Sequence, residues 1–99
     1  MSFERTLVDV LMEDGTEYLN VPISNKDRLR GEDVGARHKW GSPEDKPMKY
    51  LTFYTYASLI RTGKLPAGTS YDQFVQLHED IAVAGQEQVD PTETVTPGV

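Results

Sequence analysis

Apolar and polar residues alternate near the start of the chain, and the pattern predicts a β-hairpin. The first strand is expected over residues 4–12 and the second over residues 17–23. One face of the second strand is apolar, formed by Leu19, Val21 and Ile23. Asp14-Gly15 lies between the two runs and indicates a type I′ turn, whose two central residues both need positive φ. Because a two-stranded hairpin is marginal alone, helices should cover its apolar face.

The next segment, residues 24–39, suits a short helix that begins at one of several good N-cap residues. Its few apolar positions fall on one stripe made by Leu29, Ala36 and Trp40. Gly31 and Gly35 each weaken a helix by up to about 1 kcal/mol relative to Ala. The pattern therefore predicts a weak helix, followed by a loop up to Pro47.

Residues 48–62 form the most apolar segment, and we expect the central helix of the domain there. Pro47 suits the first turn of a helix, and Gly63 suits the residue that ends one. Apolar side chains cover more than half of the helical circumference. The sequence therefore predicts a helix that is buried on more than one side.

The last helix has the clearest start. Ser70 and Gln73 match a capping box, in which each side chain satisfies a backbone N–H of the first turn. The apolar stripe runs through Phe74, Leu77 and Ile81, and Gly85 is expected to end the helix. Residues 86–99 are rich in Pro, Thr and acids, and they are expected to be a disordered tail.

These elements predict an α+β fold with one domain over residues 1–85 and a disordered acidic tail over 86–99. The N-terminal hairpin should pack on a small three-helix unit, with the long aromatic helix nearest the strands. No internal repeat is visible in the sequence.

Composition narrows the classes of function. The 99 residues carry a net charge of −6 and contain no cysteine. Disulfides, zinc–thiolate sites and catalytic thiols are therefore excluded, and an acidic balance argues against a general binder of nucleic acids or anionic membranes. No apolar run approaches the roughly 20 residues of a membrane span, and residues 1–14 lack the apolar core of a signal peptide. We expect a cytoplasmic protein.

Charge is unevenly distributed along the chain. Residues 25–64 hold nine bases and five acids, whereas residues 65–99 hold six acids and no base. In one interpretation the acidic ends lie near the basic middle in the folded molecule and weaken its positive electrostatic potential. In the other, the basic middle meets an acidic partner.

Candidate catalytic and metal-binding residues are sparse. His38 and His78 are each alone in their segments, and Ser58 has no nearby base. His78, Glu79 and Asp80 would point to different sides of a helix, so they cannot converge on a metal ion unaided. We expect no catalytic residue, no metal site, no cofactor and no enzymatic activity.

Aromatic residues are concentrated in a short stretch. Five of them lie within seventeen residues, namely Trp40, Tyr50, Phe53, Tyr54 and Tyr56, and they are interleaved with bases. The rings could form the core of a small domain, bind another protein, or stack on nucleotides. The residues chosen as candidate protein-binding anchors are Trp40, Tyr50, Tyr54 and Arg61.

Several features together resemble the tail assembly chaperones of long-tailed, siphovirus-type bacteriophages. The resemblance spans residues 5–85 and is carried by the hairpin with Asp14-Gly15, the run 25–32 and Trp40. It continues through Pro47, the aromatic run 52–57, the run 59–63, and Tyr71-Asp72-Gln73-Phe74 before an acidic tail.

This resemblance implies a non-enzymatic role in tail assembly. Chaperones of this family bind the tape measure protein and tail tube subunits in the host cytoplasm and are absent from the finished virion. A second, longer product made by a programmed frameshift is common in the family. Self-association is left open.

Two other interpretations remain. The chain could be a small acidic phage-encoded inhibitor of a host nucleic-acid-binding protein, which would need Asp72, Glu79, Asp80 and Glu87 on one surface. It could also be a head–tail connector or completion protein of the virion, which would need ring-like self-association.

Overall fold

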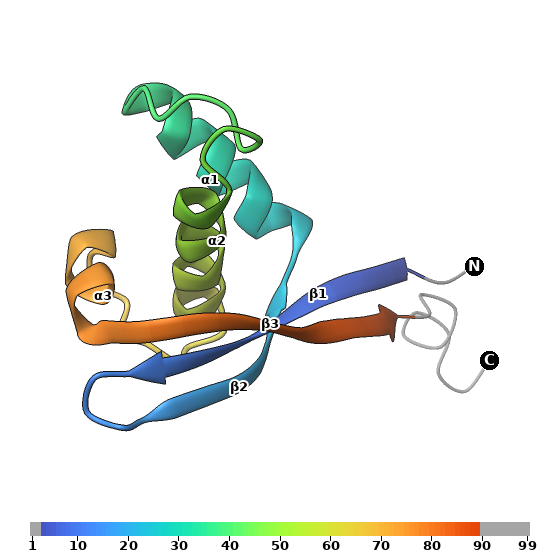
Figure 1. Ribbon diagram of the computed structural model, residues 1–99, viewed down its shortest axis with the longest axis vertical. Coiled ribbons are helices and arrows are strands. Elements are labelled where there is room, and N and C mark those ends of the chain that lie inside the picture. The colour runs from blue at the N-terminus through green and yellow to red at the C-terminus, as the bar shows by residue number, and fades with distance from the viewer. Residues whose placement is uncertain (1–2, 90–99) are drawn as a thin grey trace.

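Three antiparallel strands form a sheet, and three helices lie on one of its faces (Figure 1). The computed structural model describes residues 3–89. In chain order the elements are β1 (Phe3–Met12), β2 (Glu17–Ile23), α1 (Asn25–Arg37), α2 (Pro47–Arg61), α3 (Tyr71–Leu77) and β3 (His78–Val89). The strand order is β2-β1-β3, with both pairs antiparallel. The predicted α+β class is confirmed.

The third strand was not predicted from the sequence. Residues 78–89 form β3 along β1, whereas we expected a helix as far as Gly85 and a disordered tail from residue 86. Ile81 pairs with Val10 and is buried, so alternation along a strand explains the apolar position that had been assigned to a helical stripe. Gly85 lies where the register with β1 shifts, which is a common place for a strand glycine. The expected tail beyond Val89 lies outside the described residues.

The hairpin between β1 and β2 is confirmed, but its turn is of another type. Gly15 has φ of +92°, while Asp14 does not have positive φ. The N–H of Met12 donates to the carbonyl of Thr16 at 2.8 Å, which closes a three-residue loop. Asp14 accepts the N–H of Thr16 at 2.9 Å, and this bond lowers the pKa of Asp14. One glycine in the left-handed region is sufficient for this longer loop.

A bulge in β2 turns Leu19 away from the core. Asn20 adopts φ of +54°, and its N–H donates to Asp9 Oδ1 at 2.8 Å. Val8 pairs with Val21 but Val10 pairs with Tyr18, so two residues of β2 lie opposite one residue of β1. Consequently Val21 and Ile23 are buried, whereas Leu19 is 61% exposed. The predicted apolar face of three residues was wrong at Leu19.

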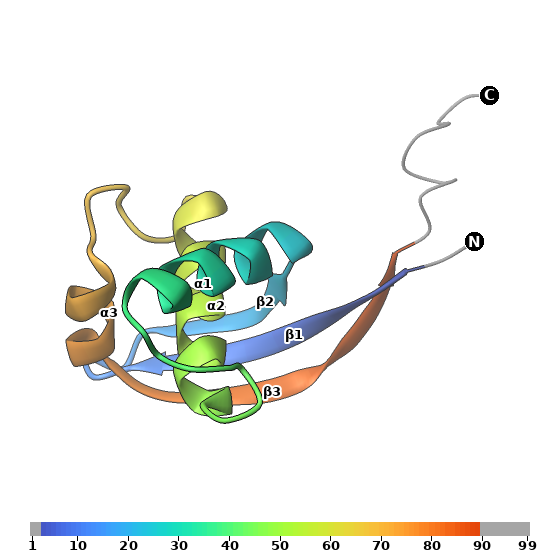
Figure 2. The same cartoon turned by 90° about the horizontal axis from the view of Figure 1, so that it is seen from above.

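The core lies between the sheet and α2. Valines and Ile23 from the strands pack against Phe53, Ala57 and Leu59, and Phe74 of α3 closes one end. The buried residues of α2 surround the helix, as predicted for the central helix. The N-terminal half of β1 and the C-terminal half of β3 extend beyond the helices (Figure 2).

The first helix contacts α2 through its glycines, and of the predicted apolar stripe only Trp40, beyond the helix end, packs on α2. Gly31 and Gly35 are buried, whereas Leu29 is 56% exposed and Ala36 is also exposed. A Cβ atom on Gly31 would lie 2.7 Å from Cδ1 of Tyr54, and one on Gly35 would lie 2.7 Å from Cζ of Tyr50. The two glycines therefore allow α1 to rest directly on tyrosine rings of α2.

We predict that Gly35→Ala destabilises the fold by about 2 kcal/mol, although Ala is the better helix former. The Tyr50 ring is buried and cannot move aside to admit the methyl group. Urea unfolding measures the loss. Ala36→Gly, at the neighbouring exposed position, should cost only the propensity difference of about 1 kcal/mol. A stabilising effect of Gly35→Ala would contradict the close contact.

Candidate functional site

Trp40 occupies a defined position because α1 ends in a left-handed turn. Lys39 has φ of +57°, and the N–H of Trp40 donates to the carbonyl of Gly35 at 2.9 Å. This six-to-one bond is the Schellman arrangement, in which the residue after the turn packs back against the helix. The indole is thereby directed toward α2 and α3.

Aromatic rings surround Trp40 on several sides. The ring centroids of Tyr50, Tyr71 and Phe53 lie 5.5, 5.8 and 5.9 Å from that of Trp40. The contacts with Tyr50 and Phe53 are edge-to-face, a geometry that aromatic pairs favour. Trp40 and Tyr71 are only partly buried, so this ring cluster continues from the core to the surface.

A groove opens beside the indole, and we call it the Trp40 groove. Its lining residues are Val34, His38, Trp40, Lys49, Ser70, Tyr71 and Asp72. The ammonium of Lys49 lies 5.0 Å from the indole centroid, within range of a cation–π interaction. The imidazole of His38 stacks on the indole at 6.1 Å. An apolar floor with both signs of charge on its rim suits an apolar side chain from a partner.

Three of the four predicted anchors, Trp40, Tyr54 and Arg61, remain at least partly exposed, but Tyr50 does not. Tyr50 is 3% exposed, and its hydroxyl donates to the carbonyl of Gly41. Its ring packs against the Trp40 ring, and because it is buried it cannot itself contact a partner. Tyr54 lies 6.1 Å from Tyr50 over Gly31, and burial together with Glu32 raises its pKa.

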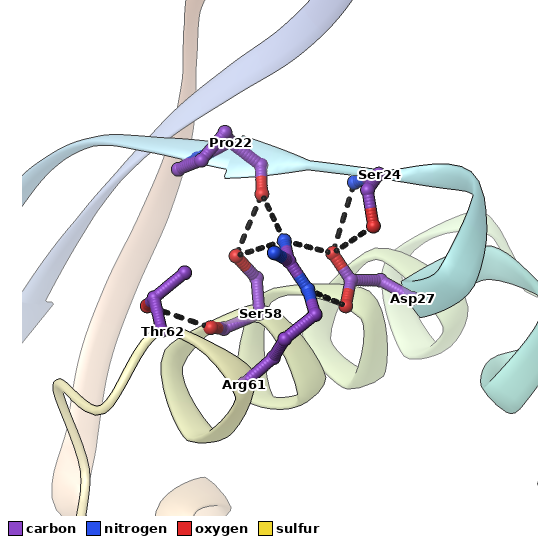
Figure 3. A network of polar contacts seen from close by, with 6 residues as sticks. All are labelled: Pro22, Ser24, Asp27, Ser58, Arg61 and Thr62. Carbon is purple, nitrogen blue, oxygen red and sulfur yellow. Dashed lines mark hydrogen bonds and ion pairs between the residues drawn. The ribbon is translucent and has the colours of Figure 1, made fainter.

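The fourth predicted anchor, Arg61, belongs to a partly buried polar network at the other end of α2 (Figure 3). Its Nε and Nη2 donate to the two carboxylate oxygens of Asp27 at 3.1 and 3.0 Å. The side chain of Asp27 is 1% exposed and also accepts the N–H of Ser24 at 2.9 Å. The hydrogen bonds from Arg61 to Asp27 raise the pKa of Arg61. Arg61 therefore fixes α1 to α2 and is not part of the groove.

Of the residues that line the groove, sequence reasoning selected only Trp40 as a protein-binding anchor. Tyr71 was noted only in the run at the start of the last helix, and His38 only as an isolated histidine. The capping box that places Tyr71 at the start of α3 was visible in the sequence and is confirmed by the bonds between Ser70 and Gln73. The contact between Tyr71 and Trp40 joins segments about thirty residues apart, and no local sequence pattern indicates such a contact.

Ser58 and His78, which were considered for chemistry, are engaged in contacts within the fold. Ser58 is buried, and its hydroxyl donates to the carbonyl of Pro22 at 2.6 Å. The ring of His78 stacks on Phe74, with Nδ1 2.8 Å from the carbonyl of Val75. Within residues 3–89, no group of three or more acidic or histidine side chains is placed to hold a metal ion.

In the same range, no helix has both the length and the apolarity to cross a membrane.

The acids of the C-terminal third do not share one surface. Asp80 pairs with Leu11, so its side chain lies on the face of the sheet that is turned away from the helices. Asp72 lies on the rim of the Trp40 groove. The side chain of Glu87 lies outside the described part of the chain. This placement does not favour a single acidic face that imitates a row of phosphates.

Interpretation of the Trp40 groove rests on its own geometry. No family model, curated protein or solved structure matches this chain significantly. The groove is the place where partly exposed rings, a cation and a carboxylate meet, so it is the candidate site for binding another molecule.

We predict that Arg61→Ala destabilises the fold by about 3 kcal/mol, because it leaves the Asp27 carboxylate buried without its cation. Urea unfolding followed by circular dichroism measures the change. Arg37→Ala is the matched control, since Arg37 pairs with Asp33 on an exposed face of α1 at 3.5 Å. Its loss should stay below about 0.5 kcal/mol. Equal losses in the two variants would show that Asp27 does not depend on Arg61.

Stability should fall in alkaline solution partly because of Tyr71. Burial, with a contribution from Asp72, raises the pKa of Tyr71. A raised pKa means that the folded state holds the phenol proton more tightly, so this stabilisation is complete below about pH 10 and is lost as the pH rises through the folded pKa. Urea midpoints from about pH 9 to about pH 11.5 should decline less steeply in Tyr71→Phe. Identical slopes would contradict the burial of the phenol.

Proposed function

We propose that this chain is a tail assembly chaperone of a long-tailed bacteriophage. In this role it binds the tape measure protein and tail tube subunits during assembly in the host cytoplasm and carries out no reaction. The resemblance described above suggests the family. The observation that carries the proposal is the Trp40 groove, a partly exposed aromatic surface suited to protein binding.

The groove is organised before any partner arrives. Trp40 is held by the Schellman turn on one side and by the rings of Tyr50, Phe53 and Tyr71 on the other. An anchor that is already fixed loses little conformational entropy on binding. Trp and Tyr are also the residue types that most often dominate the energy of protein interfaces. These properties favour a binding surface over a passive part of the core.

The rim of the groove suits a helical partner. The imidazole of His38, the ammonium of Lys49 and the carboxylate of Asp72 border the groove, while its floor is apolar. An amphipathic helix can place one apolar residue on the indole and polar residues against the rim. A tape measure protein is expected to be long and helical, so it would offer such segments repeatedly.

Net charge supports the same role. A charge of −6 on 99 residues opposes self-aggregation of the chaperone while it covers an aggregation-prone partner. The acidic-inhibitor alternative is less well supported because Asp80 lies on the outer face of the sheet, whereas Asp72 borders the Trp40 groove among the helices.

The single tryptophan provides a direct test. Tryptophan-free fragments of the tape measure protein should shift the emission of Trp40 saturably when they enter the groove. Lys49→Glu should weaken binding about fivefold by removing the cation over the indole. Lys26→Glu makes the same charge change at an exposed site at the start of α1, and it should change the affinity less than about twofold.

Two results would contradict the proposal. One is the absence of binding to any fragment by a protein whose circular dichroism is native. The other is saturable binding that leaves Trp40 emission unchanged and responds equally to both lysine variants.

A further inference from the structure

The face of the sheet opposite the helices carries leucines that are half-buried, at Leu7 and Leu11, or exposed, at Leu19. The helices lie on one side only, as far as residues 3–89 show (Figure 1). Val8 and Val10 of β1 are fully buried beneath them, so Leu7 and Leu11 point to the other side. Antiparallel sheets that face water usually place polar residues there. A leucine-bearing outer face therefore indicates that something packs on it.

The bulge in β2 adds a third leucine to this face. Asn20 in the left-handed region reverses the alternation, so Leu19 turns outward and is 61% exposed. Leu11, Leu19 and Ala82 border one hollow across all three strands. We call Leu7, Leu11, Leu19 and Ala82 the outer sheet patch.

Carboxylates surround the hollow of this patch. Its border includes Asp9, Glu17 and Asp80. Two of them are held in place by the backbone, because Asp9 Oδ1 accepts the N–H of Asn20 and Asp80 Oδ1 accepts the N–H of Ile81, each at 2.8 Å. The result is an apolar centre with fixed negative charge at its edge.

We infer that the outer sheet patch binds an amphipathic helix whose apolar residues are flanked by Lys or Arg. Charge complementarity selects the basic flanks, which would meet the three carboxylates. The spacing suits a helix laid along β1. Leu7 and Leu11 are four strand residues apart, or about 13 Å, which is close to the rise of two helical turns, about 11 Å.

A second copy of this chain fits the patch less well. Packing two such faces together would bring the carboxylates of Asp9, Glu17 and Asp80 against their own counterparts. Each chain also carries a charge of −6, so long-range repulsion opposes the approach. The occupant that matches the charge of the patch is therefore a basic segment of another protein.

This inference does not depend on the proposed function. The patch and the Trp40 groove lie on opposite sides of the sheet, because the groove is built from helices and their connections. The chain can thus hold two segments at once, one on each side.

The test uses a fluorescein-labelled peptide of about 18 residues, long enough to be helical when bound, with leucines on one face and lysines on the other. Binding is measured by fluorescence anisotropy near physiological salt, about 0.15 M, because salt at this concentration screens diffuse electrostatic attraction. Leu19→Lys should weaken binding about tenfold. Leu29→Lys changes the charge equally at a leucine of 56% exposure on the helical side, and it should weaken binding less than about twofold. Trp40→Phe should leave the affinity unchanged.

Several results would overturn the inference. Equal losses in Leu19→Lys and Leu29→Lys would mean diffuse attraction to an acidic protein. A loss in Trp40→Phe as large as that in Leu19→Lys would place the peptide in the groove. If the native protein does not bind the peptide, a basic amphipathic helix is excluded as the occupant of the outer sheet patch. A dimer in sedimentation that Leu19→Lys dissolves would assign the patch to a second copy.

Discussion

Close contact between the glycines of α1 and the tyrosines of α2 sets the position of the candidate site. Gly31 and Gly35 lie on the rings of Tyr54 and Tyr50, where a β-carbon would overlap with ring atoms. This contact fixes the position in space of the C-terminal end of α1. The left-handed turn at Lys39 then directs Trp40 toward Tyr71. A helix held further away would separate the indole from the α3 side of the groove.

The first helix is held at both ends although its sequence favours helix only weakly. At its start Asp27 binds Arg61 of α2, and at its end Trp40 packs among aromatic rings. Short helices derive most of their stability from tertiary packing, and α1 is an example in which ionic and aromatic contacts replace an apolar stripe. Leu29 and Ala36 are consequently exposed, while Val34 packs against the core.

Local signals in the sequence predicted much of the fold. Asp14-Gly15, Pro47 and the Ser70 capping box each mark an element boundary that the structure confirms. The predictions that failed are those at positions where a contact with a distant part of the chain decides the structure. Residues 78–89 become a strand because β1 offers a pairing partner more than sixty residues earlier, and Leu19 turns outward because Asn20 adopts a left-handed conformation. Arg61 was selected from its residue type, but its role depends on Asp27, which only the folded chain brings near.

We propose that Trp40, supported by rings from α2 and α3, is the residue at which this chain binds a protein partner. Two-dimensional ¹H–¹⁵N NMR on the labelled chain, titrated with fragments of the tape measure protein, tests this most directly. The indole N–H of Trp40 and the amides of His38, Lys49 and Tyr71 should shift together along one saturation curve. Saturable binding that leaves these four signals in place would contradict it.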